Sequence, residues 1–253
     1  SANSEPETVA ITNYVLSVFP DQKGPNPGDK VPELTATGMF IDLHSYSRLV
    51  LWPWGYTYDL APNDPALKVM SYKFAYYNGH DPQKSTELYP TTGSTDDWSY
   101  GELGVPGFCF EVGDDFHQNC TVFNNDINPN NQQALLRAIK IARRPYRLAY
   151  GPETTNLSLQ ANPVQPGQDL IVNYTADDTL YSSYLGGIPS QSIDSIRYSF
   201  DKPSWISGSG ARTIVLRTQV PKYTSTFTAS TTGLTSGQHT LFVESLDGSG
   251  AWG

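Results

Sequence analysis

The chain has 253 residues, 38% of them hydrophobic, which is enough to bury one large core or two modest ones. Its net charge of -9, with no cluster of Lys and Arg, argues against nucleic acid as a partner. No apolar run reaches the roughly 20 residues that cross a bilayer, and residues 1–8 lack the apolar core of a signal peptide.

The composition also suggests a compartment. Only 16% of the residues are charged and 16 are Tyr, a profile typical of a secreted protein. Cys109 and Cys120 are close enough in sequence to close a small loop, and an oxidising compartment would preserve that bridge. We predict a disulfide between them, the alternative being two buried free thiols.

The first elements are a helix followed by two strands. Ser4 and Glu7 have the spacing of a capping box, so a helix is expected from there on. Its predicted apolar face consists of Ile11, Tyr14, Val15 and Val18. The apolar run 39–43 predicts a buried strand that ends at His44, and residues 49–52 predict a second strand.

Two further helices enclose a third strand. Residues 64–79 open on Asp-Pro and end on Asn-Gly, which are helix start and stop signals. Residues 107–112 predict a strand. Residues 128–145 open on Asn-Pro and end on Arg-Arg-Pro, which places cations at the negative end of a helix dipole. This part of the chain is therefore expected to be an α/β fold.

After Tyr150 the helical periodicity stops. Short alternating segments separated by Gly, Pro, Asp and Ser follow at residues 157–159, 170–174, 196–200, 213–216, 224–228 and 240–243. Such spacing predicts an all-β sandwich of about 100 residues. We therefore expect two domains, 1–147 and 148–253.

Two side chains at predicted strand ends could carry chemistry. His44 follows a buried strand, where open α/β sheets collect ligand sites, although a single strand-end His is more often structural. Glu111 ends the apolar run 108–110, so burial would raise its pKa towards that of a general base. Pairing of Glu111 with a nearby Arg is the alternative.

Four segments resemble the pancreatic carboxypeptidase A and B family of zinc peptidases. They are HSYS at 44–47, LWPWGY at 51–56, YPTTGSTDDWSY at 89–100 and FCFE at 108–111. Their order and spacing also match the family pattern. The resemblance covers residues 1 to about 145 and implies a carboxypeptidase-like mixed sheet with helices.

The resemblance implies a role for each matching residue. His44 would be a zinc ligand and Glu111 the general base. Tyr89 would close over the bound carboxy-terminal residue, while Ser45 and Tyr46 would line the substrate groove. Asp96 would lie at the base of the specificity pocket and pair with a terminal Lys or Arg; capping a loop turn is its alternative role.

The chain departs from the family in its metal ligands. The family's His-x-x-Glu pair is absent, since the residues three positions after the four histidines are Ser47, Gln83, Cys120 and Phe242. The family's substrate-binding Arg and Asn-Arg residues would also lie upstream. A catalytic zinc normally needs three protein ligands. We therefore expect an incomplete catalytic domain that is inactive alone and binds the upstream half of the same enzyme.

The resemblance as a whole implies a secreted zinc-dependent exopeptidase that acts on peptide or protein carboxyl termini, with a preference for basic residues. One alternative is a catalytically silent relative that binds peptide. Another places the function in the β-sandwich, as a carbohydrate-binding module with a sugar-stacking face formed by Tyr181, Tyr184, Trp205 and Tyr223.

Overall fold

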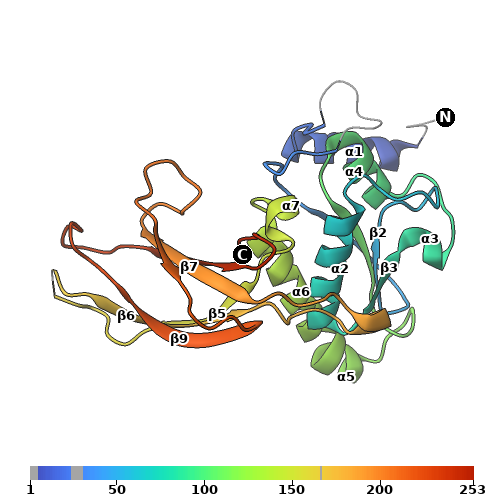
Figure 1. Ribbon diagram of the computed structural model, residues 1–253. Coiled ribbons are helices and arrows are strands. Elements are labelled where there is room, and N and C mark those ends of the chain that lie inside the picture. Colours follow the sequence, from blue (N-terminus) through green and yellow to red (C-terminus); the bar gives the residue numbers. More distant parts are fainter. Residues whose placement is uncertain (1–4, 24–30, 166) are drawn as a thin grey trace. The chain divides into compact units, whose positions relative to one another are not determined.

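The computed structural model describes residues 5–23, 31–165 and 167–253 (Figure 1). The predicted capping residue Ser4 lies outside these ranges. The chain divides into two compact units, residues 1–149 with 181–188, and residues 150–180 with 189–253. Among the helices in the described ranges, none is long and apolar enough to cross a membrane.

The first unit contains both helices and strands. They are α1 (Pro6–Val18), β1 (Phe40–His44), β2 (Leu49–Trp52), α2 (Asp64–Asn78), β3 (Asp81–Lys84), α3 (Ser85–Leu88), α4 (Thr95–Leu103), β4 (Gly107–Glu111), α5 (Cys120–Val122), the π-helix η1 (Phe123–Ile127), α6 (Asn128–Ile141), α7 (Pro145–Leu148) and the 3₁₀-helix η2 (Tyr184–Gly186). The predicted α1, α2, α6, β1, β2 and β4 are confirmed. The sequence patterns did not indicate β3, α3 or α4.

The four strands form one mixed sheet in the order β1-β4-β2-β3. β1 runs parallel to β4, β2 runs parallel to β3, and β4 is antiparallel to β2. The α/β class expected from the sequence is therefore confirmed for this unit. Parallel pairing of β1 with β4 brings two strand ends together that lie 67 positions apart in the sequence.

β4 alternates between two environments because successive side chains of a strand point to opposite faces. Phe108 and Phe110 are fully buried and pack against Phe74 of α2, with ring centroids 5.2 and 5.8 Å apart. α2 therefore covers one face of the sheet (Figure 1). Cys109 and Glu111 consequently point to the other face.

Helix α1 forms as predicted, but its predicted core face is mostly exposed. Val15 is buried beside Leu103 and Val105. The remaining apolar side chains of the helix are between 38% and 71% exposed: Val9, Ile11, Tyr14, Leu16 and Val18. The spacing identified the helix correctly, but one residue of the predicted face contributes to the core.

The second unit is built of strands alone. They are β5 (Glu153–Leu159), β6 (Leu170–Asp177), β7 (Ile193–Phe200), β8 (Arg212–Val215), β9 (Lys222–Ala229) and β10 (Leu241–Asp247), and each overlaps a predicted segment. They form two three-stranded antiparallel sheets, β10-β7-β8 and β5-β6-β9. One core cluster draws on both sheets, with Val172 and Phe227 from one and Ile196 and Tyr198 from the other.

The four aromatic residues considered for a sugar-stacking face are divided between the units. Tyr181 and Tyr184 belong to the first unit, where the Tyr181 ring lies 5.0 Å from Lys73 Nζ. In the second unit, Trp205 packs on Phe242 and Tyr223 on Tyr174. The structure therefore gives no support to one binding face on the second unit.

We expect His80, which precedes β3, to make the first unit less stable in acid. His80 is 2% exposed with Nδ1 3.4 Å from the Leu49 carbonyl oxygen, and burial lowers its pKa from 6.5 to about 4. As the pH falls from 6.5 to about 4, the unfolded chain takes up the proton first, so the free energy of unfolding falls by on the order of 3 kcal/mol.

Denaturant unfolding of wild type and His80→Gln across this pH range checks the prediction. As the pH falls, the free energy of unfolding should decrease more in wild type than in His80→Gln. A difference that is the same at every pH would contradict it. Comparison with the variant removes the contribution of carboxylates, which titrate in both proteins.

Candidate active site

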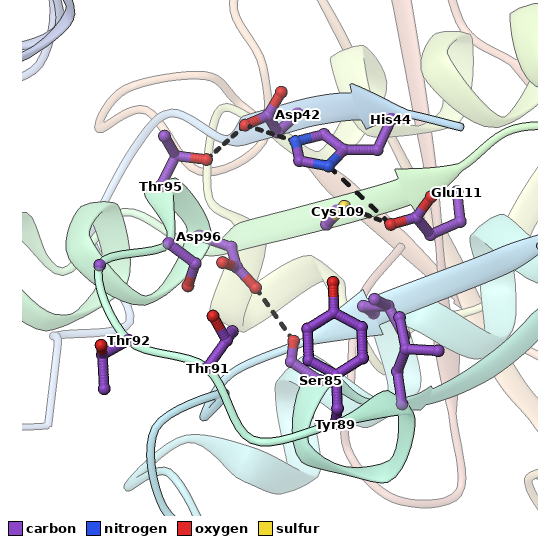
Figure 2. Close-up of a pocket in the computed structure, with 14 residues that line it drawn as sticks. Asp42, His44, Ser85, Tyr89, Thr91, Thr92, Thr95, Asp96, Cys109 and Glu111 are labelled. Atoms are coloured by element: carbon purple, nitrogen blue, oxygen red, sulfur yellow. Dashed lines mark hydrogen bonds and ion pairs between the residues drawn. The ribbon is translucent and has the colours of Figure 1, made fainter. Parts of the chain in front are cut away.

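The pairing of β1 with β4 places four functional side chains on one face of the sheet. His44 pairs directly with Glu111, and Asp42 pairs with Cys109. Because the side-chain period of a strand is two residues, all four point away from α2. They form the upper part of Figure 2.

These residues border a pocket of about 320 Å³. Its wall comes from β1, β2 and β4 on the sheet, from α3, and from the segment that leads into α4. The lining residues are Asp42, His44, Leu51, Ser85, Leu88, Tyr89, Thr91, Thr92, Gly93, Ser94, Thr95, Asp96, Cys109 and Glu111. The sheet thus carries a mixed apolar and acidic cavity at the end of β1 and β4.

The predicted ligand and the predicted base lie side by side. His44 Nδ1 is 3.9 Å from Glu111 Oε1, and the other ring nitrogen, Nε2, is 3.3 Å from Asp42 Oδ2. Glu111 is buried, and burial raises the pKa of its carboxyl above the usual value, although His44 opposes this. No Arg among the described residues forms an ion pair with Glu111, so the alternative Arg–Glu pair is not formed.

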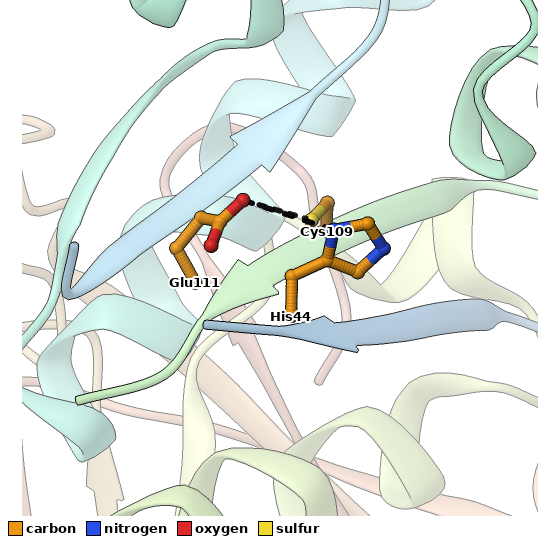
Figure 3. Close-up of side chains that lie close together, drawn as sticks. All are labelled: His44, Cys109 and Glu111. Carbon is orange, nitrogen blue, oxygen red and sulfur yellow. Dashed lines mark hydrogen bonds and ion pairs between the residues drawn. The ribbon is translucent and has the colours of Figure 1, made fainter. Parts of the chain in front are cut away.

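Cys109 completes a group of possible metal donors. One donor atom each from His44, Cys109 and Glu111 lies within 4.8 Å of the others, at the ends of neighbouring strands (Figure 3). Imidazole, thiolate and carboxylate are all zinc ligands. Burial, reinforced by the carboxylate of Glu111, raises the pKa of the thiol, so Cys109 is protonated at neutral pH.

The predicted disulfide is not formed. Cys109 and Cys120 are both free thiols in the structure. Cys109 is buried on β4 with Sγ 3.9 Å from Glu111 Oε1, whereas Cys120 is exposed at the start of α5. Closeness in sequence was misleading because the alternation of β4 directs Cys109 into the pocket.

Asp96 lies in the first turn of α4 rather than in a loop. It is 3% exposed, and its Oδ2 accepts a hydrogen bond of 3.1 Å from Ser85 Oγ (Figure 2). The neighbouring Asp97 accepts hydrogen bonds from the backbone of Gly55 and Tyr56. Asp97 thus anchors α4, while Asp96 supplies a buried carboxylate to the pocket.

Gly107 allows α4 to approach the sheet this closely. It starts β4 directly beneath the helix, and a Cβ at this position would collide with the carbonyl oxygen of Asp96 and lie 2.7 Å from its Cα. Such distances are not compatible with a side chain. The backbone of the pocket residue Asp96 therefore rests on a glycine.

The predicted substrate-contacting residues are not all in the pocket. Tyr89 lines it from the side opposite His44, is 60% exposed, and directs its hydroxyl towards the strands (Figure 2). Ser45 and Tyr46 are exposed and are not lining residues. Tyr46 packs edge-on against Phe116, with ring centroids 4.9 Å apart.

Arg48 connects the segments that follow the two central residues. Its guanidinium binds both Asp114 carboxylate oxygens, at 2.6 and 2.8 Å, and contacts Asp126 at 2.8 Å. Arg48 comes four residues after His44, and Asp114 comes three residues after Glu111. A bidentate pair of this kind is geometrically specific and braces the two strand ends against each other.

The motif matches did not reveal Asp42, Thr95 or Ser85 as members of the site. Thr95 Oγ1 donates a 2.5 Å hydrogen bond to Asp42 Oδ2, and Ser85 donates to Asp96. Asp42 had one usable signal, since a residue two positions before His44 on a strand must share its face. Thr95 lies within the family segment 89–100 but was given no role there, and Ser85 had no signal because α3 was not expected.

The chain is similar to known zinc carboxypeptidases. The family model described as zinc carboxypeptidase matches residues 1–137. The chain is 26% identical over 155 residues to carboxypeptidase B of Canis lupus familiaris, covering 56% of the chain and 32% of the relative. It is 31% identical over 149 residues to mast cell carboxypeptidase A of Homo sapiens, covering 55% and 32%.

A bacterial protein and a solved structure are also similar. A zinc carboxypeptidase of Saccharothrix mutabilis subsp. capreolus is 40% identical over 78 residues, covering 28% of the chain and 18% of the relative. Bovine thrombin-activatable fibrinolysis inhibitor, solved with a tick carboxypeptidase inhibitor, is 19% identical with a TM-score of 0.41, covering 56% of the chain and 45% of that chain. The chain spans about a third of the length of carboxypeptidase B.

Proposed function

The chain belongs to the zinc carboxypeptidase family, and on this premise we propose that it forms the carboxyl-terminal part of a zinc-dependent exopeptidase that releases carboxy-terminal residues from peptides. The observation that carries the proposal is the direct pairing of His44 with Glu111 at the rim of the pocket. It puts an imidazole and a buried carboxylate on the same side of one cavity.

Of the three possible zinc donors, we assign the metal-binding role to His44, whose Nδ1 faces Glu111 on the pocket side. When bound, zinc polarises a carbonyl and lowers the pKa of water. Glu111 accepts the proton of the attacking water and delivers it to the leaving amine, which a carboxyl of raised pKa does more readily than an ordinary one. Glu111, rather than Cys109, is the proposed base, because burial raises the pKa of the Cys109 thiol in the metal-free site.

We propose that the pocket receives the side chain of the terminal residue and favours Lys or Arg. Asp96 is the buried carboxylate that would pair with the basic group, and Ser85 holds it in place. Tyr89 is exposed at the opposite rim, where its ring can cover a bound residue. Tyr46 and Ser45 would contact the peptide outside the pocket.

We further propose that an upstream part of the same enzyme supplies the other zinc ligands and the groups that bind the substrate's carboxylate. Two exposed features support this. β1 is an edge strand of the described sheet, with Leu43 55% exposed. The outward side chains of α1, including Tyr14 at 71%, form an apolar surface that a folded partner would cover.

We propose that residues 148–253, apart from 181–188, which belong to the first unit, are an accessory β-sandwich. Their two antiparallel sheets with a shared core support that architecture. The low fraction of charged residues and the Tyr content support a secreted protein. A stabilising or targeting role for this domain follows from fold analogy.

The test uses the full-length protein that contains this chain and its upstream segment. We expect stoichiometric zinc in the purified protein and release of a terminal Arg from a peptide faster than release of a terminal Leu. The 253-residue chain alone should release neither. Zinc-free, inactive full-length protein would contradict the proposal and favour a catalytically silent peptide-binding relative.

A further inference from the structure

The His44 ring has one nitrogen facing each of two carboxylates. Nδ1 faces Glu111 Oε1 at 3.9 Å, and Nε2 faces Asp42 Oδ2 at 3.3 Å (Figure 2). The ring therefore lies between the pocket rim and the strand from which Asp42 projects. Only the side of the ring occupied by Nδ1 is directed at the proposed general base.

Packing alone does not hold this ring in place. The His44 side chain is 53% exposed and lies at the end of β1, an edge strand of the described sheet. A neutral imidazole with this much freedom can exchange its two tautomers and turn about its side-chain bonds. Its orientation must then depend on polar contacts, and Asp42 provides one.

Asp42 is itself held. Its Oδ2 accepts the 2.5 Å hydrogen bond from Thr95 Oγ1, and Thr95 is the first residue of α4. The Asp42 side chain is 30% exposed, less than that of its His44 partner. Its place two residues before His44 on β1 puts the carboxylate on the same face of the sheet. Asp42 is therefore held in place by Thr95 and can restrict the orientation of the more exposed His44 ring.

We propose that Asp42 is a positioning residue for the metal site: it accepts a hydrogen bond from the Nε2–H of His44 and so keeps Nδ1 as the unprotonated, zinc-binding atom directed into the site. Carboxylates in this relation to a metal-bound imidazole fix its tautomer and raise its basicity. The inference rests on the proposed function, because it assigns a role in holding the zinc proposed above. Asp42 lies outside the four segments that resemble the carboxypeptidase family, so the inference adds a residue to the proposed metal site.

The experiment measures zinc affinity of the full-length protein by competition with a chromophoric chelator. Wild type, Asp42→Asn and Asp42→Ala are compared with Asp59→Asn, which removes an exposed carboxylate of the same unit that is not in the pocket. We expect the zinc dissociation constant to rise about 10- to 100-fold in the Asp42 variants. It should stay at the wild-type value in Asp59→Asn.

Nitrogen NMR of the histidine rings gives a second readout. In the zinc-loaded wild type, His44 should carry its proton on Nε2, and in Asp42→Ala the signal of that proton should broaden or disappear. A carboxylate that only stabilises the fold would change neither the zinc affinity nor this signal. Unfolding curves of the metal-free proteins show whether a variant has lost its fold. If Asp42→Ala does not fold, the zinc affinity of Asp42→Asn, which keeps the shape of Asp, decides whether Asp42 has a positioning role.

The outcomes separate the two proposals. If the wild type binds zinc and both Asp42 variants bind it equally well, Asp42 has no positioning role and the proposed function stands. If the wild-type full-length protein neither binds zinc nor releases terminal residues, the proposed function itself fails. Weaker zinc binding in the Asp42 variants, with Asp59→Asn unchanged, supports both.

Discussion

Replacing Glu111 with Gln in the full-length protein should lower kcat by about 100- to 10,000-fold, the usual contribution of a general base. Gln keeps the shape of Glu but cannot accept the proton from the attacking water. Glu111 is buried, and burial raises the pKa of its carboxyl, which makes the carboxylate a stronger proton acceptor than an exposed one. Steady-state hydrolysis of a peptide with a terminal Arg measures the effect.

The same substitution at Glu102 is the matched control, because Glu102 is an exposed residue of α4 outside the pocket. Glu102→Gln should retain wild-type kcat and KM. Zinc content should be unchanged in both variants, since the proposed role of Glu111 is proton transfer. A Glu111→Gln enzyme with wild-type kcat would remove Glu111 from the mechanism.

Replacing Asp96 with Asn should change which terminal residue is released. The variant should lose roughly 10- to 100-fold in kcat/KM for terminal Arg, the range expected for a buried hydrogen bond to a charged group. Release of terminal Leu should be unchanged or faster, because the pocket loses a buried charge that an apolar side chain cannot pair. The ratio of the two kcat/KM values is the measurement.

Asn at this position can still accept the hydrogen bond from Ser85, so α4 should keep its place. If kcat/KM falls equally for Arg and Leu, Asp96 supports the structure of the pocket and does not choose the substrate. Asp59→Asn again serves as the charge control, since it lies outside the pocket.

The sequence predicted the elements of the fold better than their packing. Helix α1 followed from its apolar spacing, yet Ile11, Tyr14 and Val18 are exposed, because what a helix face contacts depends on the rest of the fold. Helix α4 was missed for the opposite reason. Its buried positions include the polar Asp96, Asp97 and Ser99, so it shows no apolar stripe.

The sequence indicated individual candidate residues of the site, but it did not indicate which of them are in contact. His44 and Glu111 were identified from motifs, but their contact depends on the parallel pairing of β1 with β4, which no local pattern encodes. The disulfide prediction was wrong because sequence distance does not report side-chain direction. Asp42 could have been recognised from its position two residues before His44 on a predicted strand, but its contact with Thr95 depends on α4, which was not expected.

Gly107 sets how closely the start of α4 approaches the sheet. The backbone of Asp96 rests directly on this glycine, and any larger residue there would push the start of α4 away from the sheet. The Asp96 carboxylate would then move relative to β4 and β1, which carry Glu111 and His44. The separation between the buried Asp96 carboxylate and Glu111 therefore depends on a residue that has no side chain of its own.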